Sequence, residues 1–323
     1  MKIAILVDDV WNFNKLIVER LQQKNHIVTF IDSSEIHFSY KNNVQRLTNF
    51  FSKTLLNKNI KNGFLDKKLK EIISDLPKQD CILIINPDTF KEDIINLLKT
   101  KTDKYIAHNY DSLERHPLPE NYKELFDNVF SFDIQDVKKY DYLTLLNNFI
   151  YLEKCLLTTP KNKMFMILSK SKDRELILGK IADILDKKNT TNYEFIVVNP
   201  EIRKDINKNI VLTNKTISLE EVAEKINNAE ILIDLVRPNQ SGLSFRFFEA
   251  MALHKKVITN NKNVKLFDFY NPNNILVINN DDFNDINDDF LNNVYTPVPE
   301  HIYQKYTIDA WIETAFNIPS KIN

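Results

Sequence analysis

The chain has 323 residues, 43% of them hydrophobic, and its 43 Lys and Arg residues nearly balance 44 Asp and Glu residues. This length accommodates two ordinary domains, each with its own core. A net charge of -1 argues against a general nucleic-acid-binding protein, because such proteins carry a strong basic excess. The glycines are only Gly63, Gly179 and Gly242, so neither a GxGxxG fingerprint nor a P-loop occurs, which excludes the commonest dehydrogenase and NTPase classes.

Cysteine usage and hydropathy indicate a cytoplasmic protein. The two cysteines, Cys81 and Cys155, form neither a disulfide framework nor a metal-ligand spacing. The apolar run at the N-terminus is too short for a signal peptide, and no run of about 18 apolar residues occurs. We therefore expect a cytoplasmic location, with peripheral attachment to the inner face of a membrane as an alternative.

The first half of the chain alternates between strand and helix patterns. Apolar runs and helical spacing predict a helix at 11–23 and strands at 2–7, 26–31, 81–85, 104–108 and 127–132. In a parallel sheet the loops that follow the strands lie at the edge where ligands bind. Asp8, Asp9 and Asp111, which follow two of these strands, are therefore expected at that edge.

Asp111 is the preferred candidate for a general base, because a carboxylate at a strand exit is held rigidly. Asp9 is a second candidate. Both residues have a structural alternative: Asp8 or Asp9 caps the helix that begins near Trp11, and Asp111 stabilises a turn before Ser112. The sequence leaves these alternatives open.

A basic amphipathic segment occupies 40–71, where apolar residues recur at helical intervals among many lysines. Such a helix can lie on an anionic membrane, where a lipid-linked acceptor would be found. The alternative that we favour is a domain helix with a solvated face.

The β-α-β rhythm restarts after a polar, proline-containing segment at 158–163. Helices are expected at 174–187, 219–226 and 306–316, and strands at 164–168, 194–198, 210–212, 231–233, 256–259 and 275–278. We predict domains at 1–158 and 159–305, followed by a terminal segment at 306–323. The acidic run 279–289 is expected to cap and solvate a helix rather than to hold a metal ion.

The loop 169–174 follows the first strand of the second half and enters a helix. It carries Lys170, Lys172 and Arg174. Cations at a helix N-terminus oppose the helix dipole, so their presence favours a bound diphosphate over a plain turn.

The stretch 230–261 reads as a strand, a polar loop with Gly242, a helix and a second strand. Arg237 lies at the exit of the first strand and Arg246 at the start of the helix, and both can bind phosphate oxygens. Glu249 follows Arg246 by three residues and shares its helical face. It can therefore accept hydroxyl groups from the same ligand.

This stretch resembles the donor-site signature of the GT-B glycosyltransferases, especially those of the retaining kind. The resemblance rests on Gly242, Glu249-Ala250-Met251-Ala252 and Val257-Ile258. It implies that Glu249 binds the ribose of a nucleotide sugar, and that the loop of Ser241, Gly242 and Leu243 approaches the diphosphate or the sugar. It also implies two Rossmann-like doubly wound domains facing a cleft, with a C-terminal helix that crosses back to the first domain.

Three positions depart from the signature. Ser241 stands where the retaining enzymes have another glutamate, His254 replaces a glycine and Lys256 replaces a proline. The change at Ser241 leaves the retaining mechanism open, whereas a left-handed helix cap tolerates His254. The stretches 8–13, 110–112 and 125–133 are similar to the N-terminal half of CgeB-like and lipopolysaccharide-core glycosyltransferases.

We therefore expect a metal-independent glycosyltransferase of surface polysaccharide or lipopolysaccharide biosynthesis. The C-terminal domain would bind a nucleotide sugar, and the N-terminal domain a glycan or lipid-linked acceptor. No cofactor beyond the donor substrate and no nucleic-acid partner are expected. The alternatives are a nucleotide-sugar epimerase or hydrolase of the same fold, and a degenerate GT-B subunit that binds without catalysis.

Overall fold

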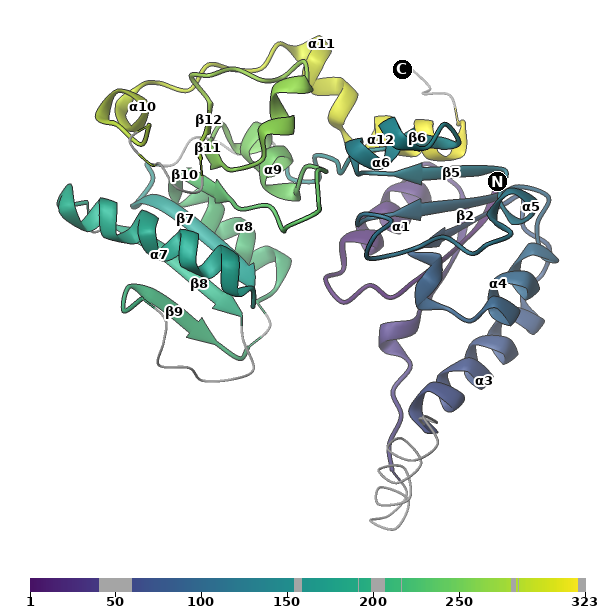
Figure 1. The fold of residues 1–323 in the computed structure, drawn as a ribbon. Helices are drawn as coiled ribbons and strands as arrows, with labels where there is room; N and C mark the ends of the chain where they lie inside the picture. The colour runs from purple at the N-terminus through teal and green to yellow at the C-terminus, as the bar shows by residue number, and fades with distance from the viewer. Residues whose placement is uncertain are drawn as a thin grey trace. The chain divides into compact units, whose positions relative to one another are not determined.

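The computed structural model describes residues 1–40, 60–153, 159–190, 192–198, 207–215, 217–279, 283 and 285–318. The chain divides into two compact units. The first unit comprises Met1–Phe132, Asp136–Leu146 and Ala315–Ile318, and the second comprises Asp133–Gln135 and Asn147–Thr314. Figure 1 shows the ribbon of both units.

The first unit contains a parallel sheet of six strands in the order β2-β1-β3-β4-β5-β6. Strands β1 and β3 are mostly apolar, and β1, β3 and β4 are almost entirely buried, as expected for strands covered on both faces. The strands are β1 Lys2–Val7, β2 Ile27–Asp32, β3 Cys81–Ile85, β4 Tyr105–Asn109, β5 Asn128–Ser131 and β6 Leu143–Leu145.

Helices lie between successive strands, as in a doubly wound fold. They are α1 Phe13–Gln23, η1 Ser33–Glu35, α3 Ile60–Asp75, η2 Pro87–Thr89, α4 Glu92–Lys99, α5 Tyr122–Leu125 and α6 Ile134–Lys139. Helix α3 buries Leu69 and Ile73 against the core of the first unit. This supports the domain-helix interpretation for 60–71, while 41–59 lies outside the described residues.

The second unit repeats the architecture with six parallel strands in the order β12-β11-β10-β7-β8-β9. Its core gathers side chains from the strands and from α7. The strands are β7 Asn162–Ser169, β8 Tyr193–Val198, β9 Ile210–Thr213, β10 Ala229–Asp234, β11 Lys256–Thr259 and β12 Ile275–Val277. The helices are α7 Lys172–Lys187, α8 Leu219–Asn227, α9 Phe245–Leu253, η3 Lys262–Leu266, α10 Asp288–Asn292, α11 Glu300–Tyr303, η4 Gln304–Tyr306 and α12 Ile308–Phe316.

Each sheet has one topological switch point, a strand whose neighbours on its two sides are reached by connections that run in opposite directions across the sheet. In the first unit β2 pairs with one side of β1 and β3 with the other, and in the second unit β8 and β10 flank β7 in the same way. Loops that leave two such neighbouring strands diverge and open a crevice at the carboxyl edge of the sheet, where doubly wound folds bind ligands. The fold thus singles out the exits of β1 and β3, and those of β7 and β10.

The predicted α/β class with two Rossmann-like sheets is confirmed, and the predicted strands are found within one or two residues of their observed ends. The short strand β6 was not predicted, because only Leu143 of its three residues is buried. The last residues of α12 group with the first unit, where Lys104 Nζ donates to the carbonyl of Phe316 over 2.7 Å. Among the described residues, no helix has the length and apolar character needed to span a membrane.

Two departures from the GT-B signature have local structural explanations. His254 ends α9 in the left-handed conformation, with φ 52° and ψ 45°, as expected for a helix cap. Lys256 is buried, and its ammonium donates to the carbonyls of Phe290, Leu291 and Asn293 at 2.6–3.2 Å. Burial lowers the pKa of Lys256 to about 8. Lys256 therefore ties the end of α10 to β11.

We expect Lys256→Met to destabilise the second unit. The methionine retains the apolar stem but leaves buried carbonyls without their donor, which costs roughly 1–3 kcal/mol. The measurement is the free energy of unfolding in urea at pH 7, followed by circular dichroism. The control is Lys265→Met, which changes an exposed lysine of η3. Equal stability of the two variants would show that the ammonium of Lys256 does not hold α10.

Candidate functional site

Two arginines from different strand exits meet at the end of β7. The hydroxyl of Ser169 accepts hydrogen bonds from Arg237 Nη2 at 2.7 Å and from Arg174 Nη2 at 3.4 Å, and the carbonyl of Ser169 accepts from Arg174 Nη2 at 3.1 Å. Arg174 lies in the first turn of α7, and Arg237 follows β10. The switch point between β7 and β10 therefore carries two guanidinium groups at the start of a helix, an arrangement suited to a phosphate.

The first turn of α7 combines charges of both signs. Lys170 and Lys172 are exposed beside the buried Arg174. The carboxylate of the buried Glu175 accepts a hydrogen bond from the backbone N–H of Ser171 at 2.8 Å, which satisfies one of the free amides at the helix start. The predicted cations Lys170, Lys172 and Arg174 thus all lie at the start of α7. Glu175 places a carboxylate in the same turn, where the helix dipole favours it.

A buried aspartate lies behind the arginines. Asp234, the last residue of β10, accepts hydrogen bonds from the hydroxyls of Ser244 at 2.6 Å and Thr259 at 2.9 Å. Burial raises the pKa of Asp234, and the positive charges of Arg246 and Arg174 act in the opposite direction. Asp234 therefore fixes the start of α9 through Ser244 and brings its carboxyl group close to Arg174 and Arg246, two of the predicted phosphate-binding side chains.

Glu249 and Arg246 share one face of α9, as predicted from their spacing. Glu249 is 1% exposed, its Oε2 forms an ion pair with Arg246, and its Oε1 accepts a hydrogen bond from the hydroxyl of Tyr151 at 2.5 Å. Both oxygens of the predicted ribose-binding carboxylate thus have protein partners. Tyr151 lies about a hundred residues before Glu249, and no local pattern in the sequence indicated its role.

The loop of Ser241, Gly242 and Leu243 is buried and held by three side chains. Asp133 accepts hydrogen bonds from the backbone N–H of Ser241 at 2.6 Å and from its hydroxyl. Asn261 Nδ2 donates to the carbonyls of Ser241 and Gly242 at 3.2 and 3.0 Å, and Asn148 Nδ2 donates to that of Leu243 at 2.8 Å. Gly242 does not have a positive φ, so its conformation does not itself demand glycine.

Asp9 caps the first helix of the first unit. Its carboxylate accepts hydrogen bonds from the backbone N–H groups of Asn14 and Lys15 at 2.9 and 3.1 Å and from Asn14 Nδ2 at 3.1 Å. This is the structural alternative that the sequence offered for the Asp8 and Asp9 pair. Burial raises the pKa of Asp9.

Asp111 lies beyond β4, where it pairs with Arg115 and accepts a hydrogen bond from the backbone N–H of Ser112 at 3.0 Å. The nearby His116 was not identified from the sequence. Its Nδ1 lies 2.9 Å from both carboxylate oxygens of Asp88, which follows β3. The imidazole of His116 and the carboxylate of Asp88 thus connect the exits of β3 and β4. The two residues are 28 positions apart in the chain, so no local sequence pattern indicates the pair.

Four of the predicted donor-site residues are connected through contacts or charge in the second unit. Arg174 and Arg237 both bind Ser169, the charges of Arg174 and Arg246 act on Asp234, and Glu249 pairs with Arg246. The Ser241 loop is anchored instead on Asp133. The residues that sequence reasoning missed are Ser169, Asp234, Tyr151 and Asp133. Asp234 and Ser169 end predicted strands, so their places at a sheet edge were available as a signal.

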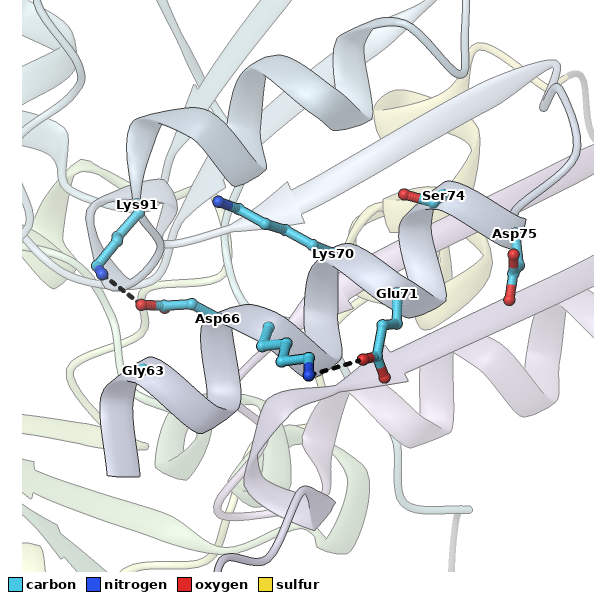
Figure 2. A pocket seen from close by; sticks show the side chains of 8 residues that line it. Gly63, Asp66, Lys70, Glu71, Ser74, Asp75 and Lys91 are labelled. Atoms are coloured by element: carbon cyan, nitrogen blue, oxygen red, sulfur yellow. Dashed lines mark ion pairs between the residues drawn. The ribbon is translucent and has the colours of Figure 1, made fainter. Parts of the chain in front are cut away.

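A separate groove runs along α3 in the first unit and contains none of the predicted site residues (Figure 2). Two of its carboxylates pair with lysines: Asp66 with Lys91, and Glu71 with Lys68 at 2.6 Å and with Lys67 at 3.9 Å. The pairs of Glu71 are exposed, as is typical of a solvated helix face, whereas the side chain of Asp66 is largely buried. Among the described residues, no group of three or more His, Cys, Asp or Glu side chains is placed to hold a metal ion.

Comparison with known proteins identifies the fold. No family model and no curated protein matches the chain. A UDP-forming α,α-trehalose-phosphate synthase from Burkholderia xenovorans, solved with glucose-6-phosphate, is similar with a TM-score of 0.56 at 9% identity, over 98% of this chain and 99% of that one. The synthase from Burkholderia vietnamiensis gives a TM-score of 0.54 at 10% identity, over 98% and 96%.

TarM is also similar, with a TM-score of 0.54 at 14% identity, over 79% of this chain and 57% of TarM. The chain thus spans little more than half the length of TarM. At these identities the likeness concerns the fold alone. The chain has the two-domain α/β fold of the GT-B class, as the donor-site signature implied.

The pair of His116 and Asp88 predicts a pH dependence of stability. The hydrogen bond to Asp88 raises the pKa of His116 above its ordinary value of about 6.5. A raised folded-state pKa means that the stabilisation is fully present below about pH 6.5 and is lost as the pH rises through the folded-state value. We expect the difference in unfolding free energy between wild type and His116→Gln to be largest at pH 5–6 and to shrink at alkaline pH.

Urea denaturation at a series of pH values measures this difference. His301→Gln, which changes an exposed histidine of α11, controls for the loss of a histidine elsewhere. A difference between wild type and His116→Gln that stays constant across the series would contradict an ionic pairing with Asp88.

Proposed function

We propose that the chain is a glycosyltransferase that moves a sugar from a nucleotide-sugar donor, bound by the second unit, to an acceptor bound by the first. The observation that carries the proposal is the convergence of Arg174 and Arg237 on Ser169 at the switch point between β7 and β10. A pyrophosphate needs several forked donors beside a helix N-terminus. The fold, shared with UDP-forming α,α-trehalose-phosphate synthases, agrees with this assignment.

The positive side chains suit the chemistry of the leaving group. When the bond between the anomeric carbon and the phosphate oxygen breaks, negative charge develops on the departing nucleoside diphosphate. Preorganised cations stabilise this charge more strongly than they stabilise the bound donor. We assign Lys170, Lys172, Arg174, Arg237 and Arg246 to this task, and we propose that they serve in place of a metal ion.

Glu249 would bind the ribose of the donor, with the loop of Ser241, Gly242 and Leu243 near the sugar. A carboxylate accepts hydrogen bonds from the two neighbouring hydroxyls of a ribose. The ion pair with Arg246 orients Glu249 on α9. This pairing couples the ribose-binding group to one of the phosphate-binding groups.

The first unit would bind the acceptor, which we propose to be a glycan or lipid-linked sugar of surface polysaccharide or lipopolysaccharide biosynthesis. The base takes the proton of the acceptor hydroxyl as its oxygen bonds to the anomeric carbon. We propose Asp111 for this task. Its carboxylate is bound by Arg115 and by the backbone N–H of Ser112, whereas that of Asp9 receives three hydrogen bonds at the start of α1 and caps this helix. The stereochemical course stays open.

The first test is a thermal-shift panel of nucleoside diphosphates. We expect at least one of them to stabilise the wild type, by about 2.7 kcal/mol at a concentration of 100 times Kd. Arg174→Ala and Glu249→Ala should lose this stabilisation while remaining folded. The matched controls are Arg20→Ala, which changes a partly buried residue of α1, and Glu224→Ala, which changes an exposed residue of α8. If no nucleotide stabilises the wild type, the donor-site assignment is wrong.

The second test separates a transferase from an epimerase or hydrolase. We expect mass spectrometry to show nucleoside diphosphate release from a nucleotide sugar only when a membrane extract containing glycan acceptors is added. Asp111→Asn should slow this transfer by about 100-fold or more and leave nucleotide stabilisation unchanged. Isomerised or hydrolysed donor formed at full rate without the extract would favour the other enzyme classes.

A further inference from the structure

Tyr151 holds one oxygen of Glu249 by a short hydrogen bond. The phenol hydroxyl donates to Oε1 at 2.5 Å, while Arg246 occupies Oε2. The aromatic ring of Tyr151 packs edge-on against Phe245, the first residue of α9, with 5.8 Å between ring centroids. Tyr151 therefore lies at the start of the helix that carries Glu249.

The backbone on the N-terminal side of Tyr151 is anchored within the second unit. Ile150 donates to the carbonyl of Tyr306 at 2.7 Å and accepts a hydrogen bond from Ile308 at 3.2 Å. Asn148 binds the carbonyl of Leu243 at 2.8 Å. These contacts bring residues 148–151 to the same region as the Ser241 loop and α9, so the position of the phenol is defined by the fold rather than by Glu249 alone.

A phenol and a sugar hydroxyl make the same demand on a carboxylate, since each is a neutral O–H donor. Burial, together with the negative charge of Glu249, raises the pKa of Tyr151, so its hydroxyl keeps its proton at neutral pH. Glu249 as a residue is only 1% exposed, so its Oε1 is buried. A ligand hydroxyl can approach this buried oxygen only if it shares the oxygen with the phenol or replaces it.

We propose that Tyr151 and a ribose hydroxyl of the nucleotide compete for Oε1 of Glu249, so that nucleotide binding displaces the phenol. This inference rests on the proposed donor site and adds a residue that sets its affinity. The competition lowers the affinity for the nucleotide, because the hydrogen bond to Tyr151 must be broken as the bond to ribose forms. It also keeps the buried carboxylate satisfied when no ribose is bound.

The decisive variant is Tyr151→Phe, which removes only the hydroxyl. Without its competitor, the ribose hydroxyl gains a buried carboxylate oxygen as acceptor, and no hydrogen bond to Tyr151 has to be broken. We expect calorimetric titration with UDP, ADP and GDP to show a roughly 10-fold lower Kd for the nucleotide that binds best, as the strength of a hydrogen bond to a charged group implies. The 2′,3′-dideoxy form of that nucleotide should gain nothing.

Tyr193→Phe is the matched control. The hydroxyl of Tyr193 donates to Asp186 Oδ1 at 2.8 Å in the same unit, so its removal also takes a phenol from a carboxylate. We expect both variants to lower the thermal midpoint, because each leaves a carboxylate oxygen without this donor. Only Tyr151→Phe should tighten nucleotide binding.

The outcomes separate the two hypotheses. If the wild type binds a nucleotide and Tyr151→Phe binds it with the same or a higher Kd, the competition is overturned. Tyr151 would then only orient Glu249. Failure of all three nucleotides to bind to both wild type and Tyr151→Phe would instead overturn the proposed donor site. Tighter binding of the dideoxy form by Tyr151→Phe would also overturn the competition, since that ligand has no hydroxyl for Glu249.

If Tyr151→Phe fails to fold, a second measurement that keeps the phenol hydroxyl still tests the proposal. With 3-fluorotyrosine placed at position 151, fluorine NMR reports the surroundings of the phenol directly. We expect the resonance to shift on saturation with the ribonucleotide and to shift much less with its dideoxy form. An identical shift with the two ligands would contradict displacement of the phenol by ribose.

Discussion

In the second unit β7 is flanked by β8 on one side and by β10 on the other, so the segments that follow β7 and β10 leave the sheet edge side by side. This constraint of a doubly wound parallel sheet underlies the whole candidate site. It brings the loop at 169–174 next to Arg237, although 63 residues separate Arg174 from Arg237 in the chain. The hydroxyl of Ser169 lies at the point where both guanidinium groups meet.

The buried carboxyl groups at this edge of the second sheet are all hydrogen-bonded or ion-paired. Asp234 is surrounded by the hydroxyls of Ser244 and Thr259 and feels the positive charges of Arg246 and Arg174, and Glu249 is satisfied by Arg246 and Tyr151. An unpaired carboxylate would be strongly destabilising in such surroundings. The same pairing holds the arginines in fixed positions, which is what electrostatic stabilisation of a leaving group requires.

The residues that replace signature positions have become parts of other interactions. Ser241, where retaining enzymes have a glutamate, is bound by Asp133 through both its amide and its hydroxyl. Lys256 has taken the place of a proline and ties β11 to the end of α10. His254 supplies the left-handed cap of α9 and stacks on Tyr295 with 5.2 Å between ring centroids. The departures are therefore integrated into the packing of the second unit.

The sequence by itself determined the class of fold and the order of its elements. Strands such as β1 and β3 are continuous apolar runs, and the spacing of Arg246 and Glu249 places them on one helical face, because both patterns follow from local backbone geometry. It also made Arg174 and Arg237 individual candidates for phosphate binding, since each follows a predicted strand.

Only the tertiary structure decided which polar groups meet. Asp9 became a helix cap, and Tyr151 reached Glu249 from another part of the chain. His116 joined Asp88, although each follows a different strand. Such pairings depend on strand order and on where loops return. These are long-range consequences of packing a whole sheet, and they leave no periodic trace in the residues that form the pairs.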